Sequence, residues 1–224
     1  MSDGKRLFVG IRVSVATANA LAQCADQVAR RATGIDLKWV APPNYHLTLK
    51  FLGWTRSDLI EALTDRLAAA VAGTPAFKLK TARLGAFPSL EKASVLWAGA
   101  DAAELAPLFA KIEATTTALG FPAETRPFHP HITLARTRET RPLKEVVLPM
   151  SEQMFSDTRV EAVTLFESET KSAGSVYKEI SRIAFIQPET IGGIAVQRQT
   201  GPLDLGDETD DGWPRDRANQ GSTH

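Results

Sequence analysis

One tetrapeptide pattern occurs twice in the chain, and it constrains the fold more than any other feature. Residues 46–49 read His-Leu-Thr-Leu, and residues 131–134, 85 positions later, read His-Ile-Thr-Leu. Each copy follows a segment that contains proline, at 41–44 and at 122–130, and proline favours turns. Alternating polar and aliphatic residues after such turns predict two half-buried β-strands.

The first copy predicts a strand with two chemically different faces. Successive side chains of a strand point to opposite faces, so His46 and Thr48 share one face. Leu47, Leu49 and Phe51 are then expected on the other face, in the core.

The second copy repeats this arrangement. His131 and Thr133 share one face, and Ile132 and Leu134 are expected to be buried opposite them. If the two strands lie close together, two imidazoles and two hydroxyls converge on one cleft.

This set of groups suits cleavage of a phosphodiester. The reaction needs a base for the attacking oxygen and an acid for the leaving oxygen, and histidine can serve as either near neutral pH. Threonine hydroxyls can bind the phosphate oxygens that gain charge in the transition state. We therefore predict His46 and His131 as catalytic residues, with Thr48 and Thr133 on the phosphate and no metal required. The alternative, two ordinary half-exposed strands, is weakened by the repetition.

Two basic residues are candidates for binding the same phosphate. Lys50 lies at an even offset from His46, which predicts that it shares the face of the imidazole. Arg136 lies five residues after His131, an odd offset, so it reaches the site if the strand twists or bulges near Ala135, or if its side chain reaches around an edge.

His129 stays ambiguous in the sequence. Pro130 interrupts the alternation between His129 and His131, and a structural role is the favoured interpretation. A zinc site built from His46, His129 and His131 is a weaker alternative, because neither motif contains a carboxylate.

The rest of the chain predicts an α+β fold with mainly antiparallel pairing. Helices are expected where apolar residues recur at helical spacing, and strands where they alternate or form short runs. The expected helices are 16–31, 57–71 and 101–119, and the expected strands are 6–13, 46–52, 77–84, 94–97, 131–135, 160–167 and 176–186.

Charge divides the chain into two parts. The 26 basic and 26 acidic residues balance overall. Residues 188–224, however, contain seven acidic and three basic residues, which leaves residues 1–187 with a charge of +4. The acidic segment has isolated apolar residues and cannot offset its ordering entropy of ~1–2 kcal/mol per residue. We predict one domain at 1–187 and a disordered tail at 188–224.

Composition narrows the class of protein. A single cysteine, Cys24, excludes an intramolecular disulfide and a cysteine-built metal cluster. No apolar run approaches the ~20 residues that span a bilayer, and the N-terminus does not read as a secretory signal. We expect a cytoplasmic protein that does not bind membranes, is a monomer and carries no cofactor.

At the two motifs the chain resembles the RNA 2′,3′-cyclic phosphodiesterases, also called 2′-5′ RNA ligases, of the 2H phosphoesterase superfamily. The similar strings are His-Leu-Thr-Leu-Lys-Phe-Leu-Gly (46–53) and Phe-His-Pro-His-Ile-Thr-Leu-Ala-Arg (128–136), and residues 6–11 and 165–177 are also similar. The resemblance covers about residues 5–187. It implies a bilobed fold with pseudo-twofold symmetry around a central cleft.

The same resemblance implies a reaction and roles. RNA 2′,3′-cyclic phosphate ends would be opened to 2′-phosphomonoesters without a metal. His46 would protonate the leaving 3′-oxygen and His131 would activate water, while Arg136 matches the family's basic residue. Joining of tRNA halves through a 2′-5′ bond is a second activity that the resemblance implies.

Two other functions stay open. One is a related 2H enzyme that acts on 2′-5′ oligonucleotides or small cyclic nucleotides. The other is a non-catalytic RNA- or nucleotide-binding module that keeps the cleft.

Overall fold

The computed structural model describes residues 3–171 and 174–185. The helices are α1 (Val15–Arg31), α2 (Ile60–Val71), α3 (Leu105–Ala118) and α4 (Lys144–Val147). The strands are β1 (Gly4–Arg12), β2 (Lys38–Trp39), β3 (His46–Arg56), β4 (Phe77–Phe87), β5 (Ala93–Asp101), β6 (His131–Arg141), β7 (Thr158–Val160), β8 (Ala162–Lys171) and β9 (Gly174–Ala184). The predicted boundary at 187 and the predicted tail at 188–224 lie outside the described residues.

All predicted helices and strands are present, and the α+β class is confirmed. The sequence missed β2, β7 and α4, because elements of two to four residues are too short to show a period. Strands β3 and β6 also run farther than expected, to Arg56 and Arg141.

The strands form one sheet whose order is nearly symmetric. Among the described residues the order is β7-β4-β5-β6-β3-β1-β8-β9, with β2 added at β6, and every strand pairing is antiparallel. The two motif strands, β3 and β6, are neighbours at the centre of this order. Each is flanked on its outer side by a long antiparallel partner, β1 or β5. This arrangement agrees with the pseudo-twofold symmetry expected from the resemblance.

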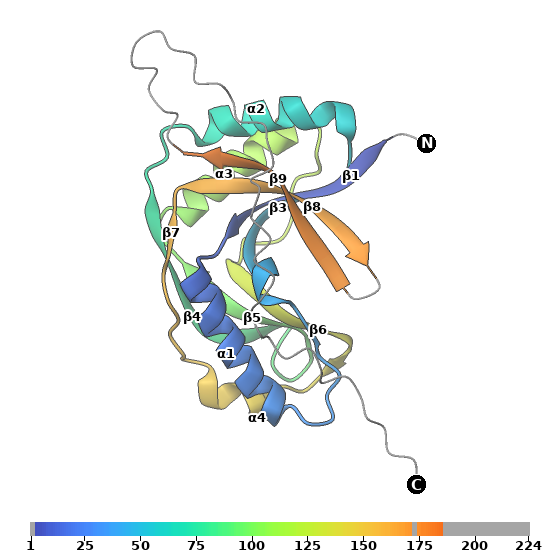
Figure 1. Cartoon of the computed structure of the whole chain (residues 1–224), viewed down its shortest axis with the longest axis vertical. Coiled ribbons are helices and arrows are strands. Elements are labelled where there is room, and N and C mark those ends of the chain that lie inside the picture. Colours follow the sequence, from blue (N-terminus) through green and yellow to red (C-terminus); the bar gives the residue numbers. More distant parts are fainter. Residues whose placement is uncertain (1–2, 172–173, 186–224) are drawn as a thin grey trace, which may run out of the picture. The chain divides into compact units, whose positions relative to one another are not determined.

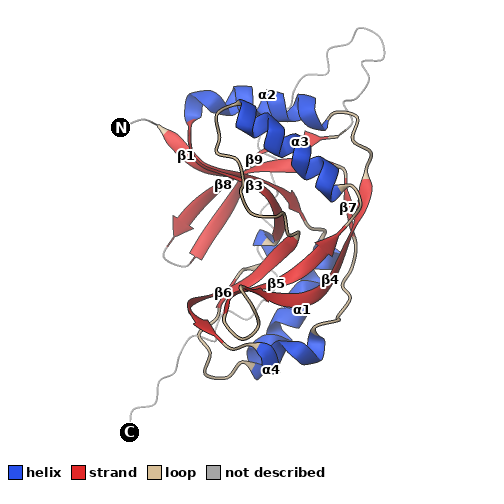
Figure 2. Ribbon diagram, turned by 180° about the vertical axis from the view of Figure 1, so that it is seen from behind, coloured by secondary structure: helices blue, strands red, loops and turns tan. Residues whose placement is uncertain are grey.

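Helices cover the two halves of the sheet separately. Figures 1 and 2 show α2 and α3 beside the half made of β1, β3, β8 and β9, and α1 and α4 beside the half made of β4, β5 and β6. Helix α1 begins after Ser14, whose hydroxyl caps the amide of Thr17. Its buried stripe includes Leu21, Cys24 and Val28, and this apolar face holds the helix against the core.

The central strands bury their aliphatic residues in this core. Leu47, Ile132 and Leu134 are completely buried, and Leu49 is 3% exposed. Burial of each such side chain stabilises the fold by about 1.5–3 kcal/mol, so the core holds the opposite, polar face of both motif strands in place.

Candidate active site

The two motif strands meet at a single pair of residues, Leu47 of β3 and Ile132 of β6. Both side chains are buried on the core face, so the residues on either side of them point to the opposite face. The antiparallel register then places Thr48 beside His131, and His46 beside Thr133. The four residues predicted from the repeat therefore lie on one face of two adjacent strands.

A β-bulge follows each motif and reverses the alternation of its strand. On β3, β1 residues Val9 and Gly10 pair with Lys50 and Thr48, so Leu49 has no partner on β1. On β6, the pairing with β5 skips Leu134 in the same way. A bulge inserts one residue, and every later side chain changes face.

The bulge in β6 brings Arg136 to the site. Leu134 and Ala135 are both buried, whereas Arg136 is exposed, so Arg136 shares the face of His131 and Thr133 despite its odd offset. Its positive charge lowers the pKa of both His131 and His46. Of the alternatives that the odd offset allowed, the structure has the bulge near Ala135.

The bulge in β3 removes Lys50 from the site, so the expectation that Lys50 faces the phosphate is wrong. Lys50 is 5% exposed and points into the core side. Its ammonium donates to Glu113 Oε1 of α3 at 2.8 Å and to the carbonyl oxygen of Pro122 at 2.6 Å. Lys50 therefore ties β3 to α3 and to the loop that precedes the second motif.

The same bulge brings Phe51 to the site face, which corrects its predicted burial. Phe51 is 63% exposed and pairs across the sheet with Phe8 of β1. Phe51 and Arg136 occupy the same offset after their histidines, so the two halves offer an aromatic ring and a guanidinium at related places.

The His46 ring is held at both nitrogens. Its Nδ1 lies 2.7 Å from the carbonyl oxygen of Asn44, and a carbonyl can only accept, so Nδ1 carries a hydrogen. Nε2 lies 3.1 Å from Thr48 Oγ1, and in the neutral ring it accepts from that hydroxyl. The nitrogen that carries no hydrogen in the neutral ring therefore faces the motif's own threonine.

The His131 ring is held in the same way. Its Nδ1 donates to the carbonyl oxygen of His129 at 2.7 Å, which again leaves Nε2 as the nitrogen available for proton transfer. The main-chain carbonyl of His129 therefore orients the His131 ring.

Aromatic side chains surround the partly buried ring of His46. Its ring centroid lies 4.7 Å from Phe8, 4.9 Å from Tyr177 and 5.8 Å from Phe166. This burial is the largest cause that lowers the pKa of His46, to about 4, and the charges of Arg12, His131 and Arg136 lower it further. The hydrogen bond to Asn44 acts in the opposite direction.

His131 has a matching aromatic surround from the other half of the sheet. Phe87 lies 5.0 Å and Trp97 6.4 Å from its ring centroid, and Trp97 pairs directly with Thr133. Burial lowers the pKa of His131 as well. Burial therefore favours the neutral form of both imidazoles.

Arg12 is a site residue that the sequence analysis missed. It pairs across the sheet with His46, its guanidinium stacks 5.2 Å from the Phe166 ring centroid, and it lies 3.5 Å from Glu179. The even spacing of Phe8, Gly10 and Arg12 along β1 is the signal that would have placed it, once β1 was known to neighbour β3.

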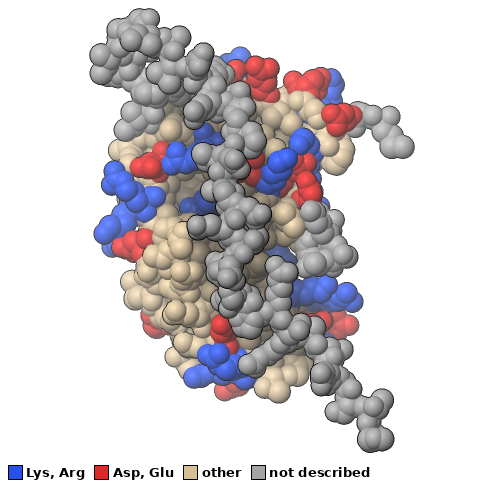
Figure 3. Space-filling view, viewed as in Figure 1, with Lys and Arg blue, Asp and Glu red and all other residues tan. Residues whose placement is uncertain are grey.

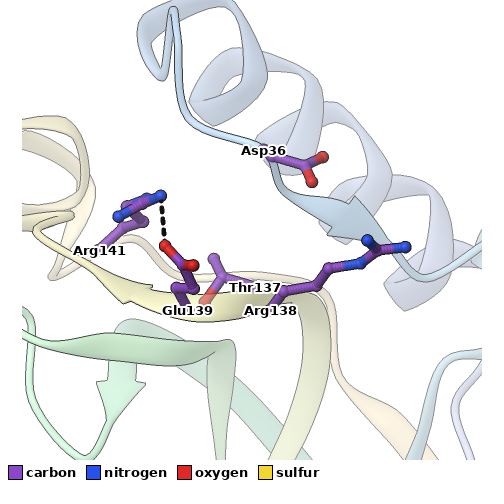
Figure 4. Close-up of a pocket in the computed structure, with 5 residues that line it drawn as sticks. All are labelled: Asp36, Thr137, Arg138, Glu139 and Arg141. Atoms are coloured by element: carbon purple, nitrogen blue, oxygen red, sulfur yellow. Dashed lines mark hydrogen bonds and ion pairs between the residues drawn. The ribbon is translucent and has the colours of Figure 1, made fainter.

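No three His, Cys, Asp or Glu side chains in the described parts of the chain are grouped so that they could hold a metal ion, so the zinc alternative lacks a ligand set there. A pocket lies elsewhere, at the end of β6, lined by Asp36, Thr137, Arg138, Glu139 and Arg141. Figure 4 shows the ion pair of Arg141 and Glu139 there, in which a guanidinium nitrogen lies 2.8 Å from a carboxylate oxygen.

Figure 3 shows Lys and Arg intermixed with Asp and Glu over the visible surface. No helix within the described residues is long and apolar enough to cross a bilayer.

Known proteins are similar to this chain over a region that contains both motifs. A family model described as LigT like Phosphoesterase matches residues 11–97 and 99–177. The RNA 2′,3′-cyclic phosphodiesterase of Aeropyrum pernix is 31% identical over 168 residues, which cover 73% of this chain and 93% of that protein. The enzyme of the same name from Aquifex aeolicus is 29% identical and covers 77% of this chain and 93% of its own length.

The fold is also similar to solved structures. The crystal structure of a protein from Thermus thermophilus aligns with a TM-score of 0.69 at 26% identity, over 80% of this chain and 97% of that one.

Proposed function

Because the chain belongs to the LigT-like phosphoesterase family, we propose that it hydrolyses RNA 2′,3′-cyclic phosphate ends to 2′-phosphomonoesters. Membership confirms the resemblance found at the two motifs and the prediction that the chain is a phosphodiesterase of this class. The observation that supports the proposed chemistry is the pairing of Leu47 with Ile132, which gives His46, Thr48, His131 and Thr133 a common face.

In the proposed reaction the two histidines share one proton. A bound phosphodiester anion raises the pKa of both imidazoles, and protonation of one opposes protonation of the other. One ring is then an acid and the other a base in the same complex. With the roles taken from the resemblance, His131 removes a proton from water through Nε2, and His46 protonates the leaving 3′-oxygen.

The other site residues act on the phosphate. The hydroxyls of Thr48 and Thr133 donate to the non-bridging oxygens, and Arg136 supplies a positive charge where negative charge grows. No step in this scheme needs a metal ion.

A direct assay tests the activity. RNA that ends in a 2′,3′-cyclic phosphate is incubated with the protein in excess chelator, and the product is identified as a 2′- or 3′-monophosphate. We expect the 2′-product, and His46→Ala and His131→Ala should each lower kcat by about 10²–10⁴-fold. Full turnover by both folded variants would refute the proposal.

A modified substrate separates the two roles. When sulfur replaces the bridging 3′-oxygen, the leaving thiolate needs no proton, so loss of the general acid matters less. We expect this substrate to restore activity to His46→Ala and not to His131→Ala. The opposite pattern would reverse the two roles.

The 2′-5′ joining of RNA ends stays a prediction. It would use the same acid and base, with a ribose 5′-hydroxyl in place of water. Incubation of the cyclic-phosphate RNA with a second RNA that carries a 5′-hydroxyl, followed by analysis of the linkage, tests it.

A further inference from the structure

The site face of β3 continues beyond the two catalytic motifs. Strand β1 alternates regularly, whereas β3 skips Leu49 and Leu52 in its pairing with β1. The pairs on the site face are therefore Gly10 with Thr48, Phe8 with Phe51, and Arg6 with Trp54, and residues opposite each other in a sheet share a face.

Trp54 is a large apolar side chain that the fold leaves open. It is 67% exposed, although tryptophan is usually among the most buried residues by area. It lies on the same face as the proposed phosphate site. At ~3.3 Å per residue, the four-residue step from Gly10 to Arg6 along β1 places Trp54 about 13 Å from Thr48.

The Trp54 indole is also supported from one side. A side chain at Gly4 would place its first carbon 2.7 Å from Trp54 Nε1 and 2.9 Å from Trp54 Cε2. The ring thus rests against the bare backbone of Gly4, while most of its surface faces solvent. A supported ring with an open surface loses little conformational entropy when a flat ligand stacks on it.

A cation accompanies the ring. Arg6 is exposed and lies directly opposite Trp54, and it makes no ion pair with another residue in the described part of the chain. An open aromatic ring beside such a guanidinium fits single-stranded nucleic acid, which offers a base to stack and a phosphate to bind.

We propose that Trp54 and Arg6 bind the RNA strand on the 5′ side of the cyclic phosphate, with a base stacked on Trp54 and a backbone phosphate at Arg6. This inference rests on the proposed function and adds the substrate class, a single-stranded oligonucleotide. Phe51 lies between Thr48 and Trp54, within reach of the nucleotide that bears the cyclic phosphate. The more distant ring, that of Trp54, stacks on the base of a preceding nucleotide.

The first test compares two substrates. kcat/KM is measured with a nucleoside 2′,3′-cyclic monophosphate and with a single-stranded tetranucleotide that ends in a 2′,3′-cyclic phosphate. We expect Trp54→Ala to lower kcat/KM about tenfold or more on the tetranucleotide and to leave the mononucleotide unchanged. Trp54→Phe should retain most of the activity, because any aromatic face can stack. Equal effects on both substrates, or none on either, would overturn the inference.

Controls separate stacking from general effects of an exposed apolar residue. Met154 is also 67% exposed, but it pairs with Ala82 of β4, away from Trp54. Met154→Ala should therefore leave kcat/KM unchanged for both substrates. Arg6→Ala should weaken the salt dependence of tetranucleotide binding, because one phosphate contact is lost. An unchanged salt dependence would remove Arg6 from the proposal.

A binding measurement keeps this inference distinct from the proposed function. Fluorescence anisotropy of a 5′-labelled tetranucleotide with a 3′-phosphate end needs no turnover. Weaker binding by Trp54→Ala than by the wild type would support the stacking surface even if no cyclic phosphate were hydrolysed. Equal binding, or a Trp54→Ala effect only on self-association of the protein, would count against it.

Discussion

His46 and His131 are oriented by the same hydrogen bond. In each ring Nδ1 lies 2.7 Å from the carbonyl oxygen two residues earlier, at Asn44 or His129. Since both carbonyls belong to the turns that precede β3 and β6, the proline-containing segments do more than start the strands. They select the neutral tautomer in which Nδ1 carries the hydrogen and Nε2 does not.

The buried state of His46 predicts a pH-dependent stability. Burial lowers the pKa of His46 in the folded protein to about 4, against 6.5 for the free side chain. Between these values the unfolded chain binds the extra proton. The free energy of unfolding therefore falls as the pH drops from 6.5 to 4, by about 3 kcal/mol from this group.

Urea unfolding at pH 7.5, 5.5 and 4.0 measures this loss. His46→Gln has no titrating side chain at position 46. Its free energy of unfolding should therefore fall less than that of the wild type over the same pH range. The carboxylates contribute to both proteins, so the difference between the two pH profiles reports His46 and its coupling to His131. Parallel pH profiles for the two proteins would contradict the prediction.

Arg136 is predicted to act on both the phosphate and the histidines. Its charge lowers the pKa of His46 and His131, so Arg136→Ala should raise both pKa values in an NMR titration. The same variant should lower kcat/KM by about tenfold to a hundredfold, the range of one hydrogen bond to a charged group. Arg136→Lys keeps the charge and should preserve the pKa values while it loses part of the activity. Unchanged titrations in Arg136→Ala would show that Arg136 does not influence the imidazoles.

Lys50 is predicted to matter for stability. Lys50→Met removes the cation that pairs with the Glu113 carboxylate, whose side chain is 18% exposed, and we expect the free energy of unfolding to fall by about 1.5–3 kcal/mol. The double variant Lys50→Met with Glu113→Leu should recover part of that stability. Unfolding in urea measures both.

Activity at saturating substrate checks the corrected position of Lys50. The folded fraction of Lys50→Met should keep a kcat near that of the wild type, because the ammonium is bound to α3 and not to the site. A loss of kcat comparable with that of Arg136→Ala would indicate that Lys50 binds the substrate phosphate after all.

Gly10 is predicted to set the position of the first motif. A side chain at Gly10 would place its first carbon 2.8 Å from the carbonyl oxygen of Leu47, between His46 and Thr48. Gly10→Ala should push β3 outward, lower kcat about tenfold or more, and cost about 1–3 kcal/mol of stability as overpacking. The assay and urea unfolding together test this, and a variant with wild-type kcat would mean that β3 tolerates the shift.

The sequence by itself determined the motif strands and the faces of their first four residues. His46 with Thr48, and His131 with Thr133, follow from the two-residue period of any strand, and the buried leucines and isoleucine between them reinforce it. The period stops being reliable where a bulge inserts a residue. For that reason Phe51 was expected in the core and Lys50 in the site, and the structure reverses both.

Only the tertiary structure decided which residues meet. A bulge depends on the pairing with a neighbouring strand, and β1 and β5 are distant in sequence from the motifs' own turns, so the local pattern contains no sign of Leu49 or Leu134 being skipped. The contact of Leu47 with Ile132, the approach of Arg12 to His46 and the open ring of Trp54 over Gly4 are likewise long-range packing results. Local residue patterns specify the chemistry that each strand can offer, whereas strand pairing determines which of those groups share a face.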